Sequence, residues 1–136
     1  MNDLLFIQQD VLPALLTGII MTLKLIVVSI PFGIAAGTVI AIGRVYGNNT
    51  ISFLCRLYVI FFKGTPLLIL LFMLYFGLPS FGITLSPFAA SVLGFIICNG
   101  AYNSEYIRGA IQSVKGGQLI AAQALGMTKW QAILNI

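Results

Sequence analysis

Residues 11–42 read VLPALLTGIIMTLKLIVVSIPFGIAAGTVIAI and contain one charged residue, Lys24. An α-helix rises about 1.5 Å per residue, so this stretch would make about 48 Å of helix. The hydrocarbon core of a bilayer is only about 30 Å thick. The stretch therefore predicts a membrane-spanning helix that is tilted or projects into water at one end.

The composition of the whole chain also indicates a membrane protein. Of its 136 residues, 60% are hydrophobic and 7% are charged, and the mean hydropathy is +1.06. Soluble domains average about 45–50% apolar and about 25% charged residues. We expect an all-α, polytopic transmembrane helix bundle that serves as a subunit or fragment of something larger. The net charge of +4 comes from seven scattered Lys and Arg residues, which form no nucleic-acid-binding patch.

Turn residues divide the chain into further helices. The first break, at 43–50, reads GRVYGNNT, and the second, at 77–82, reads GLPSFG; such clusters mark connections. We expect one partial transmembrane domain over 1–136, with spans at about 11–42, 51–78 and 87–111. A cytoplasmic loop at about 112–128 would hold a short helix ended by Gly126. A new apolar segment at 129–136 stops in mid-pattern, so we expect that more spans followed it.

The basic residues predict the orientation. They flank the first connection or follow the third span: Arg44, Arg56, Arg108, Lys115 and Lys129. Residues 79–86 and the N-terminus carry no Lys or Arg. Because cytoplasmic loops are enriched in these residues, we expect the N-terminus outside, the 43–56 turn inside and everything after about 110 inside.

The second span carries a lysine and a break in its middle. Lys63 comes directly before Gly64, Thr65 and Pro66. Irregular backbone at membrane depth is tolerated only against protein or a water-filled cavity. We therefore expect Lys63 and Thr65 to line a path for a solute. The alternative is a lysine that snorkels to the cytoplasmic interface.

The third span turns polar along one face. Four polar residues recur there at i, i+3, i+4 and i+7, which is one stripe of a helix: Asn99, Tyr102, Asn103 and Tyr106. Glu105 borders this stripe. We add Asn99, Tyr102 and Glu105 to the predicted path. Alternatively, the stripe bonds neighbouring helices, and Glu105 forms an ordinary ion pair with Arg108.

Small residues and single cysteines have plainer interpretations. Gly33 and Gly37 form a small-xxx-small pair that would let another helix approach closely, although 14 glycines in the chain make a chance pair as good an explanation. Pro31 should kink the first span unless neighbouring groups replace the lost hydrogen bond. Cys55 and Cys98 are expected to be small packing residues.

The sequence shows no catalytic constellation. It has no histidine and only three acidic residues, so it offers neither a metal cluster nor paired carboxylates. It also lacks a phosphate-binding loop of the GxxxxGK[ST] kind. We expect no enzyme activity, no nucleotide site of its own and no cofactor.

The order and spacing of three segments indicate a protein family. Residues 17–25 read TGIIMTLKL, 58–68 read YVIFFKGTPLL with LYFGLP at 74–79, and 101–111 read AYNSEYIRGAI before GQLIAAQALG at 117–126. Together they resemble the permease subunits of bacterial ABC importers for polar amino acids. The first is similar to the family's opening helix, the second to its Phe-Arg-Gly-Thr-Pro-Leu run with Lys63 in place of arginine, and the third to its cytoplasmic EAA loop. Ile120 stands where that loop has a glutamate.

The resemblance implies a partial type I permease fold in the bacterial inner (plasma) membrane, truncated at its C-terminus before the last two of five usual spans. The implied partners are an ATP-binding subunit, a second permease subunit (the same or different), an extracytoplasmic solute-binding protein and membrane lipid. ATP would be bound by the partner ATPase. Five residues of the loop would pack against that ATPase: Leu119, Ala121, Ala122, Leu125 and Gly126.

Two other functions fit the composition. A small membrane helix bundle could serve as an assembly or regulatory partner without moving solute, and it would retain no ATPase through residues 117–126. A channel-forming oligomer would need a repeated ring of polar residues and no ATPase.

Overall fold

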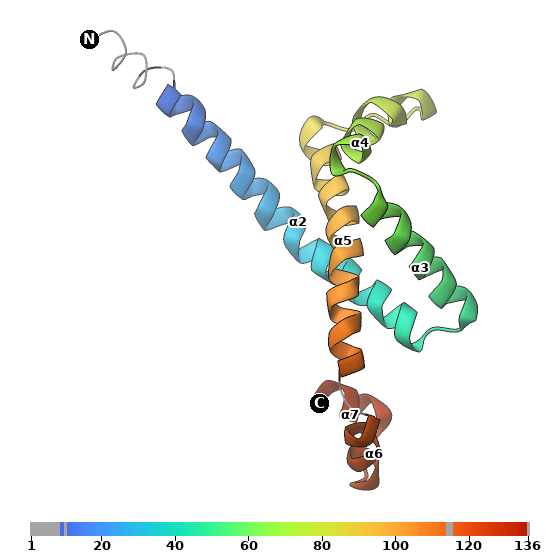
Figure 1. The fold of residues 1–136 in the computed structure, drawn as a ribbon. Coiled ribbons are helices and arrows are strands. Elements are labelled where there is room, and N and C mark those ends of the chain that lie inside the picture. The colour runs from blue at the N-terminus through green and yellow to red at the C-terminus, as the bar shows by residue number, and fades with distance from the viewer. Residues whose placement is uncertain (1–8, 10, 114–115, 136) are drawn as a thin grey trace.

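The computed structural model describes residues 9, 11–113 and 116–135, and every regular element in these ranges is a helix (Figure 1). This confirms the expected all-α class. Lys115, which the orientation argument used, and the residues before Gln9 lie outside the described residues.

Helix α2, Leu12–Tyr46, is one continuous helix of 35 residues. Pro13 lies in its first turn, where the missing N–H costs nothing. Pro31 lies inside the helix, which continues through it. The N-terminal half of α2 extends beyond the other helices (Figure 1).

The expected second span is bent sharply. Helix α3, Asn49–Gly64, begins at Asn48, whose side-chain oxygen accepts a 2.9 Å hydrogen bond from the Ile51 N–H. After a break the chain continues as α4, Leu67–Phe72, then as a π-helical turn, η2, Met73–Gly77, and a 3-10 turn, η3, Leu78–Phe81. The chain bends by 101° between the two arms. Pro66 lies at this corner and has no N–H to donate to the Phe62 carbonyl, so the helical ladder is interrupted there.

Helix α5, Pro87–Ser113, covers the expected third span. Among the described helices, α2 is long and apolar enough to cross a membrane, and the bent pair Asn49–Gly64 and Leu67–Phe81 would be a second crossing if it is one span. Helix α5 is long enough, but its second half carries Asn99, Asn103, Glu105 and Arg108, which lower its hydropathy.

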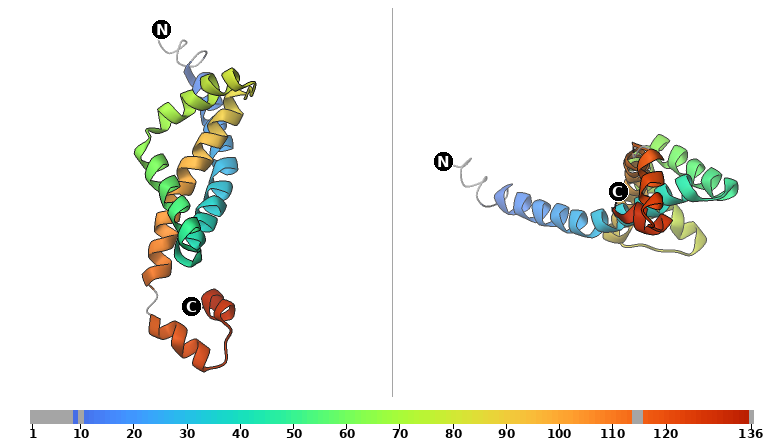
Figure 2. Two further views of the ribbon diagram at one scale, coloured as in Figure 1. Left: turned by 90° about the vertical axis from the view of Figure 1, so that its right-hand side faces the viewer. Right: turned by 90° about the horizontal axis from the view of Figure 1, so that it is seen from below.

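Helices α2 and α5 cross at a seam of small residues (Figures 1 and 2). A Cβ atom added to Gly33 would lie 2.7 Å from the Asn99 Cβ. One added to Gly37 would lie 2.7 Å from the Asn103 Cβ and 3.0 Å from the Ser104 backbone nitrogen. Only a hydrogen fits at these two positions. The predicted close approach is therefore confirmed, and the chance-pair alternative is wrong.

Helices α6, Gly116–Ala124, and α7, Lys129–Asn135, form a helical hairpin beyond the end of α5. They contact each other and none of the other described helices. Gly126 adopts a left-handed φ of 87° between them. The Met127 N–H donates to the Ala122 carbonyl and the Gly126 N–H to the Gln123 carbonyl, a Schellman ending. The predicted short helix closed by Gly126 is confirmed.

Candidate functional site

A cavity of about 370 Å³ lies between the α3–α4 corner and α5. Lys63 and Thr65 reach it from the corner, and Asn99 and Tyr102 reach it from α5. These are four of the five residues predicted to line a solute path, although the two pairs are more than thirty residues apart in the sequence. The remaining lining residues are mostly apolar: Gly64, Pro66, Leu67, Phe95 and Cys98.

Lys63 supplies the positive charge of this cavity. Its Nζ atom lies 5.5 Å from the centre of the Tyr102 ring, within the range of a cation–π contact. Lys63 is fourteen residues beyond the start of α3, which is about 21 Å along the helix from the first connection. That distance favours the cavity over the alternative of a lysine at the cytoplasmic interface. No carboxylate is among the cavity's described lining residues.

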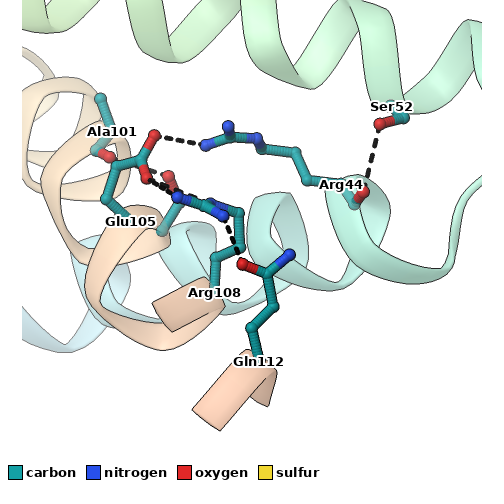
Figure 3. Close-up of polar contacts among 7 residues, drawn as sticks. Arg44, Ser52, Ala101, Glu105, Arg108 and Gln112 are labelled. Atoms are coloured by element: carbon teal, nitrogen blue, oxygen red, sulfur yellow. Dashed lines mark hydrogen bonds and ion pairs between the residues drawn. The ribbon is translucent and has the colours of Figure 1, made fainter. Parts of the chain in front are cut away.

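Glu105 lies outside this cavity, one turn beyond Tyr102 on α5, and Figure 3 shows its carboxylate between Arg44 and Arg108. One carboxylate oxygen accepts a 2.5 Å hydrogen bond from Arg44 Nη1. The other accepts bonds of 2.8 and 3.1 Å from Nη2 and Nε of Arg108. The ordinary ion pair with Arg108, weighed as an alternative from the sequence, is therefore present. Both oxygens of Glu105 are occupied by guanidinium groups.

Sequence reasoning missed the second partner of Glu105. Arg44 lies in the last turn of α2, 61 positions before Glu105, so no local spacing connects the two residues. The Arg44 carbonyl also accepts a 3.1 Å hydrogen bond from the Ser52 hydroxyl at the start of α3. Three helices thus meet at Arg44. The only signal in the sequence was that Glu105 is the one acidic residue of its span, while further basic residues lie outside that span.

The polar stripe of α5 is divided between two environments. Asn99 and Asn103 face the glycines of α2, where they support the close crossing. Tyr102 and Tyr106 are exposed by 45% and 71%. A second contact that the sequence did not predict lies nearby. The Tyr58 hydroxyl donates a 2.7 Å hydrogen bond to the Ile97 carbonyl and so connects α3 to α5.

The residues proposed to meet an ATPase lie on the α6–α7 hairpin. Ala121, Ala122 and Leu125 line a shallow depression of about 470 Å³ with Gln118, Met127 and Asn135. Leu125 is 83% exposed, and Ile120 is also exposed. Gly126 contributes the turn geometry. The side chain of Leu119 lies outside the described part of the chain.

Comparison with known families identifies the chain. Residues 29–136 match the model of the binding-protein-dependent transport system inner membrane component. The chain belongs to this family. The resemblance to amino acid permeases stated from the sequence is confirmed.

Its relatives are permease proteins of amino acid transport systems. The chain is 35% identical to the L-cystine transport system permease protein TcyB of Bacillus subtilis, and the alignment covers 96% of this chain and 56% of that protein. It is 39% identical to the putative glutamine transport system permease protein GlnP of Rickettsia conorii, over 88% of this chain and 59% of that protein. It is 37% identical to the glutamate/aspartate import permease protein GltK of Escherichia coli, over 90% of this chain and 58% of that protein.

A solved structure confirms the fold. A crystal structure of an amino acid ABC transporter with histidines superposes with a TM-score of 0.79 and 38% identity, covering 89% of this chain and 56% of that chain. The fold is therefore that of an ABC transporter permease in its matched part. The chain spans just over half the length of the relatives that it matches.

Proposed function

We propose that this chain forms part of the permease subunit of an ABC importer and contributes to the translocation path of a polar amino acid. The observation that carries the proposal is the cavity between the α3–α4 corner and α5, where Lys63, Thr65, Asn99 and Tyr102 come together. The relatives named for cystine, glutamine and glutamate/aspartate transport support this substrate class.

Within the cavity we assign Lys63 to the substrate carboxylate. Its ammonium group lies at the cavity, where a carboxylate could accept a charge-assisted hydrogen bond from it. Asn99 offers an amide that can donate to or accept from the substrate. Tyr102 holds the Lys63 side chain through its ring. Glu105, whose oxygens are both occupied by arginines, belongs to the support of the path and not to its lining.

We assign the α6–α7 hairpin to the contact with a separate ATP-binding subunit. Its exposed apolar side chains, Ile120 and Leu125, would enter a groove of that subunit. The chain itself would bind no nucleotide and need no cofactor. Its other partners would be a second permease subunit, a solute-binding protein outside the membrane, and lipid. In this arrangement, the permease has two conformations, and ATP favours one of them through the contact between the ATP-binding subunit and the hairpin.

We also propose a location in the bacterial inner membrane with the N-terminus outside. The end of α2, the first half of α3 and the end of α5, which carry Arg44, Arg56 and Arg108 in that order, would then face the cytoplasm. Lys24 lies toward the opposite end of the helices. It lines a cleft of about 460 Å³ with Phe88, the second residue of α5, so it lies level with the start of that helix. From there its amine can reach the outer interface.

Uptake by the assembled importer tests the role of Lys63. Cells that express the protein with its ATP-binding and solute-binding partners are supplied with labelled glutamine, glutamate or cystine. At substrate concentrations below saturation, Lys63→Met should lower the uptake rate at least about tenfold. The variant loses a charge-assisted hydrogen bond to the substrate carboxylate, which is worth about 1.5–3 kcal/mol. Lys63→Arg should retain most of it.

Lys24→Met serves as the matched control, because Lys24 lies outside the cavity and should leave uptake unchanged. Equal uptake by Lys63→Met and the unmodified protein, at equal amounts in the membrane, contradicts the assigned role. Failure of an ATP-binding subunit to co-purify through the hairpin would instead favour the non-transporting bundle.

A further inference from the structure

The Arg44–Glu105–Arg108 cluster joins two helices in an asymmetric way. Glu105 and Arg108 are three residues apart on α5, so their ion pair stays formed when α5 moves as a rigid helix. Arg44 belongs to α2, so its ion pair with Glu105 exists only while α5 keeps its present position against α2. Movement of α5 would break one contact and leave the other intact.

The cluster contains fewer acidic than basic side chains. Glu105 is the sole acidic residue in the part of the chain from 11 to 113, and two guanidinium groups share it. The side chains of Arg44 and Glu105 are 12% and 25% exposed, so water replaces a lost partner only in part. If Arg44 withdrew, Glu105 would still be neutralised by Arg108. The half-buried carboxylate would never be left without a counter-ion, which keeps the broken state accessible.

The position of the cluster connects it with the hairpin. Arg108 also donates a 2.6 Å hydrogen bond to Gln112, so the network covers about 10 Å of α5 up to its last turn. Helix α5 ends at Ser113, and α6 begins at Gly116. The hairpin contacts none of the other described helices. A force on α6 therefore reaches the other helices through the last turns of α5, where Arg44 is the charged contact to α2.

We propose that Arg44 is a positioning residue whose ion pair with Glu105 is a breakable joint: formed in the conformation seen here, and broken when the hairpin and α5 move, while Arg108 holds Glu105 in both conformations. This inference rests on the proposed function, because it assigns the movement to the ATP-driven cycle. Within one molecule, the joint supplies the two discrete arrangements that energetic coupling between distant sites requires.

A distance measurement on the full importer in lipid tests the joint. Spin labels are placed at Ile42→Cys on α2 and Ala110→Cys on α5, both exposed, in a background with Cys55→Ser and Cys98→Ala. The nucleotide-free importer should show one distance. Trapping with ATP and vanadate should add a second distance, and Arg44→Met should populate that second distance at least fivefold more than the unmodified protein does without nucleotide.

Three variants separate the joint from general instability. Arg44→Lys keeps the charge and should restore the single distance. The exchange Arg44→Glu with Glu105→Arg again places one acid between two cations across the same two helices, and it should restore the distance where Arg44→Met does not. Arg44→Met should also raise the ATP hydrolysed per amino acid imported, a ratio that a variant present in smaller amounts would leave unchanged.

The proposal is overturned if the labels give the same distance with and without nucleotide, or if Arg44→Met leaves the nucleotide-free distance as it was. Failure of the proposed function has a different signature. In that case no ATP-binding subunit co-purifies with the chain, whatever the distances are.

Discussion

At the scale of single residues, Gly37 has little tolerance for change. An added Cβ would meet backbone atoms of Asn103 and Ser104 as well as a side chain, so the clash cannot be relieved by a change of rotamer. Gly37→Ala should lower the free energy of unfolding by about 1–3 kcal/mol, which is typical for overpacking. Thermal unfolding of the protein in detergent measures this.

Gly18→Ala is the matched control for that variant. Gly18 lies in the same helix, and nothing is within 4 Å of a Cβ added there. Its replacement should leave the unfolding temperature unchanged or raise it, because alanine favours helix more than glycine does. If both variants unfold at the same temperature, α2 and α5 do not meet at Gly37.

Single residues also show how far sequence reasoning reaches. Lys63 and Thr65 were assigned to a cavity because a charge beside a helix break has few stable surroundings in a membrane, and the structure places both in one cavity. Arg44 could not be assigned. A pairing across 61 residues depends on how two helices cross, and side-chain spacing within one helix carries no information about the crossing.

At the scale of elements, α6 depends on the conformation of Gly126, two residues beyond its end. Gly126 has a φ of 87°, which costs a residue with a side chain about 1–2 kcal/mol. Gly126→Ala should therefore loosen the end of α6 and speed amide hydrogen exchange at Gly126 and Met127 about 5- to 30-fold. Mass spectrometry of exchanged peptides from this region provides the measurement.

Gly117→Ala provides the comparison within the same helix. Gly117 is helical and has no atom within 4 Å of an added Cβ, so the variant should slow exchange in α6. Faster exchange in both variants would mean that α6 is disturbed by any added side chain, and the special role of Gly126 would be lost.

The elements themselves were predictable to different degrees. The sequence placed the breaks correctly because Gly64-Thr65-Pro66 and Gly126 act locally, through a missing N–H and a left-handed φ. The angle of 101° at the α3–α4 corner had no such local source. It is set by packing, including Leu71, whose Cδ2 would lie 2.5 Å from a Cβ added to Gly94 of α5.

At the scale of the whole molecule, the testable property is its orientation. With the N-terminus outside, the η3 turn faces the exterior and the α2–α3 turn faces the cytoplasm. A membrane-impermeant maleimide added to intact cells should label Phe81→Cys, whose native side chain is 82% exposed. It should label Asn48→Cys only after the cells are opened, and the reverse pattern would invert the proposed orientation.

The distance in sequence between Arg44 and Glu105 has a consequence for synthesis. Ribosomes add about 5–20 residues per second, so Arg44 is made about 3–12 s before the Glu105 with which it pairs across 61 positions. During that interval α2 can insert, but its guanidinium has to stay hydrated at the membrane surface. A position in the last turn of α2 permits this. Completion of α5 would then draw the arginine into its final place, which makes the ion pair a late step of assembly.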